Sequence, residues 1–280
     1  MDIRQSSYYC KFMESIGWIV EKAGETNVFI RKLGPTSAIK IQRIKDVSGL
    51  ADINKLVRKY HPLLVKVEPK SSLLFTDYRL QQVGYKADSW PLLPTKSLIL
   101  DLNSISLGSL HKDTRYEIRK ATKSGLSFRS SEDIELFYRL LQETMKLGRW
   151  SIPIKKEVTN LYRAFQPKNS QLFLVHPPEA SDQRLQEVLL QKALGGALVI
   201  WSGNTAHYMY AALTKEGRDF GAAYFLLWET IQFCKKKGLK YLDLEGIYDE
   251  RFPKQTKNWQ GFTKFKMGWN GKVVEYPGSY

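Results

Sequence analysis

The residues best suited to chemistry lie near the carboxy terminus. Asp243 stands in the segment 241–247 (YLDLEGI), which is typical of a short strand that runs into a glycine loop. Downstream, Lys266 is placed between Phe265 and Trp269. An ammonium group among aromatic residues, where water is scarce, acts more strongly on a phosphate or a developing oxyanion than one at an open surface. We therefore expect Lys266 to be catalytic; the alternative is a lysine on the polar face of an edge strand, beside core aromatics.

Cysteine and histidine usage argues against several other kinds of site. Cys10 and Cys234 are far apart and have no partners at ligand spacing, so neither a disulfide framework nor a zinc site is expected. The sequence has no Ser-His-Asp or Cys-His signature of a covalent nucleophile. His207, in an expected strand, is open to two interpretations, a base or a structural histidine. We expect a site without metal or cofactor.

The charge of the chain favours polyanionic partners. The net charge is +15 over 280 residues, and residues 1–131 carry +10 of it. The clearest basic element is a predicted helix that Gly125 ends. Basic side chains share one of its faces: Lys112, Arg115, Arg119 and Lys123. Apolar or small ones share the other: Leu110, Thr114, Ile118 and Ala121. The basic face is either merely solvated or in contact with phosphate.

The expected elements alternate between helix and strand, which indicates an α/β or mixed α+β fold with helices packed on sheets. Helices are expected at 8–20, 53–60, 112–123, 132–147 and 221–237, and strands at 27–32, 38–43, 63–67, 97–102, 171–175, 194–201, 206–213 and 240–244. The length suits two domains. We expect an amino-terminal domain of residues 1–131 with about 269–280, and a carboxy-terminal domain of residues 132–268.

No segment predicts a membrane span or a secretion signal. No apolar run approaches the ~20 residues that a transmembrane helix needs. The amino terminus, MDIRQSS, has no apolar signal core. A cytoplasmic protein is therefore expected.

Six segments, spread in order over nearly the whole chain, form a pattern of their own. They are SIGWIVEK at 15–22, RYEIRKATKSG at 115–125, HYMY at 207–210, YFLLWE at 224–229, YLDLEGI at 241–247 and FKMGW at 265–269. Together they resemble the motifs of the FemABX family, the peptidoglycan bridge-forming aminoacyltransferases. The resemblance implies two GNAT-like acyltransferase domains, here without a coiled-coil arm, and aminoacyl-tRNA instead of coenzyme A as the donor.

The same resemblance implies roles for individual residues. Lys22 matches a family lysine that contacts the diphosphate of the peptidoglycan precursor; the alternative is an ordinary exposed lysine. Lys266 and Phe265 match the Phe-Lys pair beside the reacting ester. Tyr208 and Tyr210 match residues that line the acceptor channel, although alternating tyrosines in a strand also serve as packing residues.

Two further groups of basic residues are candidates for phosphate binding. Val158-Thr159 replaces the aromatic residues of the family pattern, which leaves Arg149 and Lys155 as alternatives for holding the second phosphate. The predicted basic helix offers a surface to tRNA or another phosphate ligand through Arg115, Arg119, Lys120 and Lys123.

The implied reaction is attack by a stem-peptide amine of a peptidoglycan precursor on the ester carbonyl of an aminoacyl-tRNA. The ester is already activated, so the protein has to align the partners, remove a proton and hold the oxyanion, the role expected for Lys266. Asp243 is a candidate base, but it could equally hold the neighbouring loop by hydrogen bonds, and the substrate itself could remove the proton. The partners are aminoacyl-tRNA, a lipid-linked or nucleotide-linked precursor and, peripherally, the inner membrane leaflet.

Two other functions fit parts of the sequence. Arg218, Gly221 and Ala223 match the Arg-x-x-Gly-x-Ala pattern with which acetyltransferases offer backbone N–H groups at a helix start to coenzyme A, so acetyl-CoA is an alternative cofactor. The third hypothesis is a non-catalytic RNA-binding module on a transferase fold.

Overall fold

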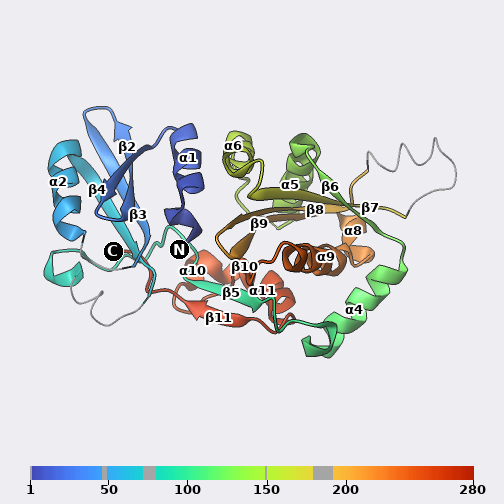
Figure 1. The fold of residues 1–280 in the computed structure, drawn as a ribbon. Helices are drawn as coiled ribbons and strands as arrows, with labels where there is room; N and C mark the ends of the chain where they lie inside the picture. The colour runs from blue at the N-terminus through green and yellow to red at the C-terminus, as the bar shows by residue number, and fades with distance from the viewer. Residues whose placement is uncertain (1, 46–48, 72–79, 149, 179–191) are drawn as a thin grey trace. The chain divides into compact units, whose positions relative to one another are not determined.

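The computed structural model of the chain describes residues 2–45, 49–71, 80–148, 150–178 and 192–280. The chain forms two compact units (Figure 1). The smaller comprises residues 1–97, 246–260 and 273–280, and the larger comprises residues 98–245 and 261–272. The chain therefore passes from one unit to the other four times.

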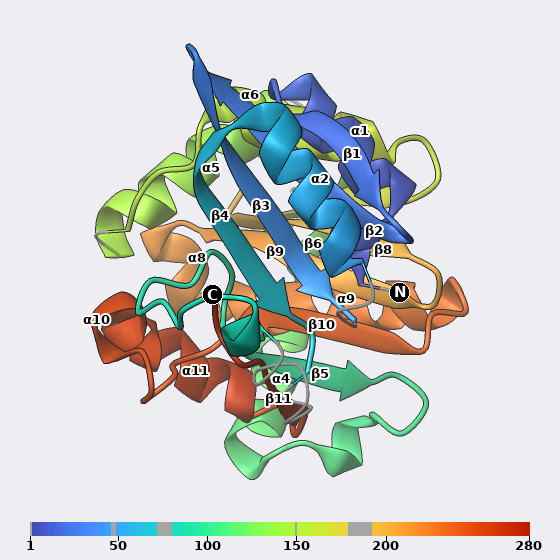
Figure 2. The same cartoon turned by 90° about the vertical axis from the view of Figure 1, so that its left-hand side faces the viewer.

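The smaller unit is built on a four-stranded sheet in the order β1-β2-β3-β4. Its strands are β1 (Ile19–Ala23), β2 (Thr26–Leu33), β3 (Thr36–Ile44) and β4 (Pro62–Pro69). Strands β1, β2 and β3 pair antiparallel, and β4 pairs parallel to β3. The parallel pair needs a crossover, which α2 (Leu50–Tyr60) provides; this helix lies against one face of the sheet, along β3 and β4 (Figure 2). The core is mostly β-branched: Val28, Ile30, Ile39, Ile41, Ile53 and Val67 are fully buried.

Shorter helices complete the smaller unit. They are η1 (Ile3–Gln5), α1 (Ser7–Ser15), α10 (Pro253–Thr256) and η3 (Lys257–Trp259). The helix expected at 8–20 ends earlier, at Ser15, because Gly17 adopts a left-handed φ of 87°. The Gly17 and Trp18 N–H groups then donate to the carbonyls of Glu14 and Met13, which closes the helix.

The larger unit holds most of a seven-stranded sheet in the order β11-β5-β10-β9-β8-β7-β6. These strands are β5 (Lys96–Asp101), β6 (Ser127–Ser131), β7 (Ser170–His176), β8 (Gly195–Ser202), β9 (Thr205–Leu213), β10 (Tyr241–Gly246) and β11 (Lys272–Glu275). Strand β5 lies beside β10 in this sheet, and β6 pairs with β7. For this reason residues 98–131 belong to the larger unit, and the boundary of the compact units falls near residue 97 and not at the expected residue 131.

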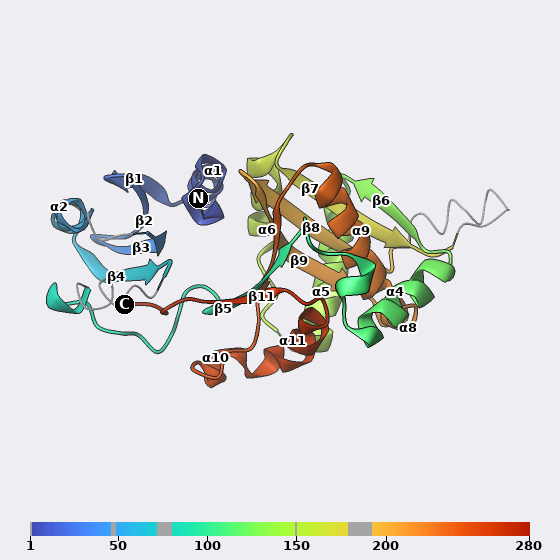
Figure 3. The same cartoon turned by 60° about the horizontal axis from the view of Figure 1, so that its bottom comes forward.

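Helices cover both faces of this sheet. They are α4 (Lys112–Lys123), α5 (Ile134–Gly148), α6 (Lys155–Phe165), α8 (Lys215–Asp219), α9 (Ala222–Lys236) and α11 (Gln260–Met267), with η2 (Leu107–Ser109). Helices α5 and α6 pack on the face opposite to α9, and α4 lies beside α9 (Figures 1 and 3). The longest described helices, α5 and α9, have 15 residues, so the described chain contains no coiled-coil arm.

The centre of the large sheet separates where β9 and β10 diverge. These strands pair in parallel only from Thr205 to His207 and from Tyr241 to Asp243. On the other side of β9, consecutive residues Leu198 and Val199 of β8 pair with Tyr210 and Tyr208, which marks a bulge in β9 at Met209. A bulge bends a strand and turns its side chains. The residues that follow His207 and Asp243 therefore line the point of divergence.

Candidate functional site

Lys266 lies on helix α11, not on the edge strand considered as an alternative from the sequence. Its side chain is partly buried, and Nζ lies 3.5 Å from the carbonyl oxygen of Glu245. Burial lowers the pKa of Lys266 to about 8, although the carboxylates of Glu245 and Asp243 act in the opposite direction. The protonated form still predominates at neutral pH, so the site contains a cation in poorly hydrated surroundings.

The aromatic partner of this cation is Phe262. Nζ of Lys266 lies 4.8 Å from the centre of the Phe262 ring, a cation–π contact. The expectation that Phe265 and Trp269 flank Lys266 is wrong, because on a helix residues four apart share a face and residues one apart do not. Phe265 and Trp269 instead form a second face, with ring centres 6.0 Å apart.

Phe265 and Trp269 pack against α9. The Phe265 ring lies 5.0 Å from that of Tyr224 in an edge-to-face arrangement, and the Trp269 ring lies 6.4 Å from it, stacked. Trp269 is fully buried. Phe265 and Trp269 thus fix α11 against α9, and Phe265 helps to position the helix that carries Lys266.

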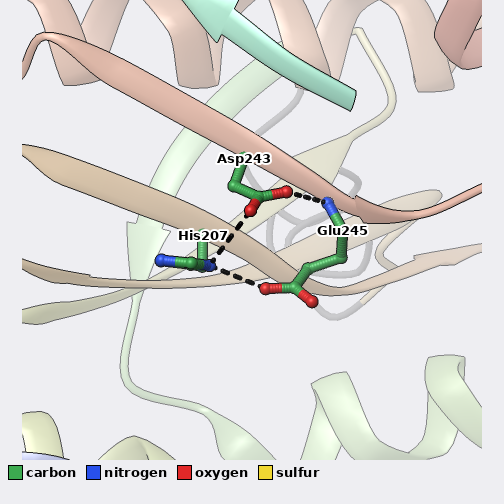
Figure 4. Close-up of side chains that lie close together, drawn as sticks. All are labelled: His207, Asp243 and Glu245. Carbon is green, nitrogen blue, oxygen red and sulfur yellow. Dashed lines mark hydrogen bonds and ion pairs between the residues drawn. The ribbon is translucent and has the colours of Figure 1, made fainter. Parts of the chain in front are cut away.

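Three titratable side chains meet at the divergence of β9 and β10: His207, Asp243 and Glu245 (Figure 4). Nδ1 of His207 lies 2.7 Å from Oε1 of Glu245 and 3.8 Å from Oδ2 of Asp243. The other oxygen of Asp243, Oδ1, accepts the backbone N–H of Glu245 at 2.7 Å. Asp243 is buried and holds the backbone of the following residues, which is the second of the roles that the sequence allowed for it.

The backbone of Glu245 adopts an uncommon conformation. Its φ is 61°, in the left-handed region that residues other than glycine rarely occupy. The hydrogen bonds that join Glu245 to Asp243 and His207 offset the free-energy cost of this backbone conformation. Residues held in such conformations cluster at functional sites.

The two tyrosines of β9 differ in exposure. Tyr208 is buried, and burial raises the pKa of its hydroxyl. Tyr210 is partly exposed, and burial together with the carboxylates of Glu157 and Glu245 raises the pKa of Tyr210 to about 12. Both hydroxyls stay neutral at physiological pH, so both can donate hydrogen bonds. The structure thus brings Tyr210 into the electrostatic environment of Glu245.

The basic helix forms as α4, with the expected faces. Thr114, Ile118 and Ala121 are buried, and the exposed face holds Arg119, Lys120 and Lys123. Arg115 differs from its neighbours. Its guanidinium donates to the carbonyls of Gly108 and Leu110 at 3.2 and 3.0 Å, so it is partly engaged in holding the turn before the helix.

The other expected phosphate ligands are one residue of the smaller unit, one residue of α6 and one residue outside the described chain. Lys22 is an exposed residue of β1 in the smaller unit. Lys155 is exposed at the start of α6, where its Nζ lies 2.6 Å from the Glu135 carboxylate. Arg149 lies outside the described residues.

A carboxylate lies near the start of α9. Gly221 has a φ of 70° and is buried against α4; a Cβ built on it would lie 3.4 Å from Cβ of Ala121 and 3.7 Å from Oε2 of Glu117. Glu117 and Asp113 also contribute to the raised pKa of Tyr224, in the first turn of α9, which burial raises most. Of the expected coenzyme A residues, Arg218 is exposed on α8, and Ala223 lies in the first turn of α9.

Sequence reasoning missed two residues of the site. Phe262 is four residues before Lys266, a signal that would have identified it had 260–267 been expected to form a helix. Glu245 directly followed the strand expected at 240–244, but its place beside His207 depends on the parallel pairing of segments 38 residues apart.

Comparisons with known proteins relate the carboxy-terminal part of the chain to one family. Residues 176–280 match the model of the FemAB family. The lipid II:glycine glycyltransferases of Staphylococcus haemolyticus (strain JCSC1435) and Staphylococcus epidermidis (strain ATCC 12228 / FDA PCI 1200) are 28% and 26% identical to this chain over 87 residues. These alignments span 31% of this chain and 20% of each relative.

Solved structures extend the likeness to the whole chain at the level of the fold. The crystal structure of FemX superposes with a TM-score of 0.80 at 18% identity, over 99% of this chain and 91% of its own. The C-terminal domain of a putative lysylphosphatidylglycerol synthetase from Agrobacterium fabrum gives a TM-score of 0.67 at 12% identity, over 98% and 87%. A tandem GNAT protein from the clavulanic acid biosynthesis pathway gives 0.53 at 10% identity, over 91% and 77%. The expected FemABX resemblance and tandem GNAT-like α/β fold are confirmed.

Proposed function

We propose that this chain, whose resemblance to the FemABX family is established, is an aminoacyltransferase that forms peptide bonds in cell-wall cross-bridges. The donor is an aminoacyl-tRNA, and the acceptor is the stem-peptide amine of a peptidoglycan precursor, either lipid II or UDP-MurNAc-pentapeptide. The single observation that carries the proposal is the partly buried cation of Lys266 beside the divergence of β9 and β10. The activity after which the two staphylococcal relatives are named, glycyl transfer to lipid II, supports the same class of acceptor.

The chemistry needs little more than alignment and charge stabilisation. Attack of an amine on an ester carbonyl places negative charge on the carbonyl oxygen. A fixed ammonium in poorly hydrated surroundings stabilises that oxyanion more than water would, because little reorganisation is required at the moment of reaction. Lys266 is the oxyanion-stabilising residue in this proposal, and Phe262 and Phe265 determine where its ammonium stands.

Basic residues bind the two anionic substrates. The exposed face of α4 contacts the phosphates of the aminoacyl-tRNA through Arg119, Lys120 and Lys123, with a smaller share for Arg115. Lys22 contacts the diphosphate of the precursor, and Lys155 or Arg149 contacts its second phosphate.

The proposed donor also sets where the reaction takes place. Charged tRNA is a cytoplasmic molecule, so in this proposal the protein acts in the cytoplasm and meets a lipid-linked acceptor by peripheral contact with the inner leaflet. Within the described part of the chain, no helix has both the length and the apolar character to span a bilayer.

Coenzyme A is the weaker alternative as donor. The Glu117 carboxylate close to Gly221 places negative charge where the pyrophosphate would have to approach the start of α9. Isothermal titration of the protein with acetyl-CoA is therefore expected to give no binding heat. Saturable binding of acetyl-CoA would favour a coenzyme A-dependent acetyltransferase over the aminoacyltransferase.

The proposed function is tested by incubating the protein with a mixture of charged tRNAs and both precursors, followed by mass analysis of the products. A mass gain of one aminoacyl unit on the stem peptide identifies donor and acceptor together. Lys266→Met is expected to lose transfer while keeping its affinity for tRNA. Lys264→Met is the matched control, because Lys264 is an exposed lysine of the same helix. No transfer by the intact protein with any charged tRNA would support the non-catalytic RNA-binding module instead.

A further inference from the structure

We propose that Glu245 accepts the proton of the attacking amine, and that His207 holds its carboxylate and Asp243 its backbone in position. The inference rests on the proposed function and adds to it the residue that moves a proton. Asp243, the base expected from the sequence, becomes a positioning residue.

Accessibility distinguishes the three side chains of the cluster. The side chains of His207 and Asp243 each have 6% relative exposure, whereas that of Glu245 has 15%. Glu245 also acts electrostatically on Tyr210 and Lys266, which lie on two different elements, β9 and α11. Among His207, Asp243 and Glu245, the carboxylate of Glu245 is therefore the group most accessible to a ligand.

Hydrogen bonds hold Glu245 at both ends. His207 Nδ1–H donates to the Glu245 carboxylate over 2.7 Å, and the Glu245 N–H donates to Asp243 Oδ1 over 2.7 Å. A left-handed conformation is unfavourable for a residue with a side chain such as that of glutamate. A residue needed only to fill this turn would be glycine or asparagine. The residue at this position is instead a glutamate, and a buried histidine holds its carboxylate.

The ammonium of Lys266 lies next to the backbone of Glu245, the residue that carries the proposed proton acceptor. Lys266 Nζ lies 3.5 Å from the backbone carbonyl of Glu245, so the ammonium and the carboxylate are both positioned by the end of β10. An acyl transfer to an amine needs a positive group at the carbonyl oxygen and a proton acceptor at the nitrogen, a few ångströms apart.

The proposed step balances in atoms and charge. The amine enters unprotonated, and its lone pair forms the C–N bond to the ester carbonyl carbon, which moves the carbonyl electron pair onto the oxygen beside Lys266. The nitrogen gives one of its two protons to the Glu245 carboxylate and keeps the other. The C–O bond to the ribose then breaks, and the Glu245 carboxylic acid gives its proton to the leaving oxygen. The amide and the free hydroxyl leave, and the carboxylate is restored.

The same three side chains have the residue types of a metal site, with ligand atoms within 4.8 Å of one another. The charge of Lys266 argues against this use, because an ammonium near both carboxylates opposes the entry of a second cation. Transfer activity is therefore expected to be unchanged after dialysis against EDTA. Loss of activity on chelation that zinc restores would overturn the assignment of Glu245 as the proton acceptor.

The experiment compares Glu245→Gln with the wild type in the mass-based transfer assay. The amide keeps the shape of the carboxylate but cannot accept the proton, so kcat is expected to fall about 10²–10⁴-fold with little change in KM for either substrate. Glu229→Gln, the same change at a partly buried glutamate of α9, is the matched control. His207→Gln is expected to show a smaller loss, because it removes a positioning group only.

A second variant separates chemistry from structure. Glu245→Gly suits the left-handed backbone and leaves room for a small acid. Formate is expected to restore transfer to this variant in proportion to its concentration, which a purely structural role would not allow. If the wild type transfers no aminoacyl group, the proposed function itself fails. If the wild type is active and Glu245→Gln keeps its kcat within about threefold, only the proton-acceptor role fails.

Discussion

At the scale of the residue, Lys266 combines a charge with poorly hydrated surroundings. Its pKa of about 8 lies close to physiological pH, so the residue is a cation there but loses its proton within the range in which enzymes are assayed. Two properties of the protein should follow the titration of this single group: the rate of transfer and the free energy of unfolding.

The rate of transfer is expected to fall as the pH rises through about 8, because the ammonium that stabilises the oxyanion is lost. Lys266→Arg keeps its charge at all assay pH values, so any transfer that it retains should lack this alkaline fall. Lys266→Met should lower kcat by about 10²–10³-fold, as removal of one oxyanion donor does. These profiles are measured from steady-state rates. A wild-type rate that stays level well above pH 8 would contradict the role of the cation.

The free energy of unfolding is expected to rise with pH relative to that of Lys266→Met. The pKa of Lys266 is lowered from 10.5 to about 8 in the folded protein, so between these values the unfolded chain binds a proton that the folded chain does not. The burial cost of this lysine is full below about 8 and is released as the pH rises towards 10.5. Urea unfolding of both proteins at a neutral and an alkaline pH gives the difference. A difference independent of pH would mean that Lys266 titrates as it does in water.

At the scale of the element, α11 depends on a close approach to α4. The backbone N–H of His111, just before α4, donates to the carbonyl of Gly268 at 3.1 Å. A Cβ on Gly268 would lie 2.3 Å from Oγ1 of Thr114, on the buried face of α4. The glycine of the Phe-Lys-x-Gly-Trp segment is therefore required by the approach of two elements, and it is not a flexible link.

Gly268→Ala is expected to destabilise the protein by about 1–3 kcal/mol, because α11 or α4 must move to admit the methyl group. Transfer activity should fall with it, since α11 carries Lys266. Gly261→Ala on the same helix is the matched control: a Cβ there meets nothing within 4 Å, and alanine favours a helix. Urea unfolding compares the variants. Equal free energies of unfolding for Gly268→Ala and Gly261→Ala would show that the protein admits the methyl group beside Thr114 without loss of stability.

At the scale of the whole molecule, the net charge of +15 favours a polyanionic substrate. Arg119→Gln combined with Lys123→Gln is expected to weaken binding of aminoacyl-tRNA without changing kcat. The slope of log Kd against log salt concentration should fall by about 1 for each phosphate that the variant no longer neutralises. Lys146→Gln, an exposed lysine of α5, is the control. Unchanged affinity and slope in the double variant would mean that the basic face of α4 is only solvated.

Local patterns in the sequence determined much of this protein. The spacing of apolar residues predicted α4 with its buried face of Thr114, Ile118 and Ala121, because helical periodicity is a property of neighbouring residues. Six short motifs sufficed for the FemABX resemblance and the tandem fold. The same motifs indicated Lys266 as the residue of greatest chemical interest.

The tertiary structure decided what surrounds Lys266. That the lysine lies on a helix, above Phe262 and not between Phe265 and Trp269, follows from the conformation of a segment with few strong local signals. The meeting of Glu245 with His207 requires β9 and β10 to pair in parallel and then diverge. Contacts of this kind join residues that are distant in the chain, and their free energy appears only when the sheet has formed, so local sequence patterns carry no direct signal of them.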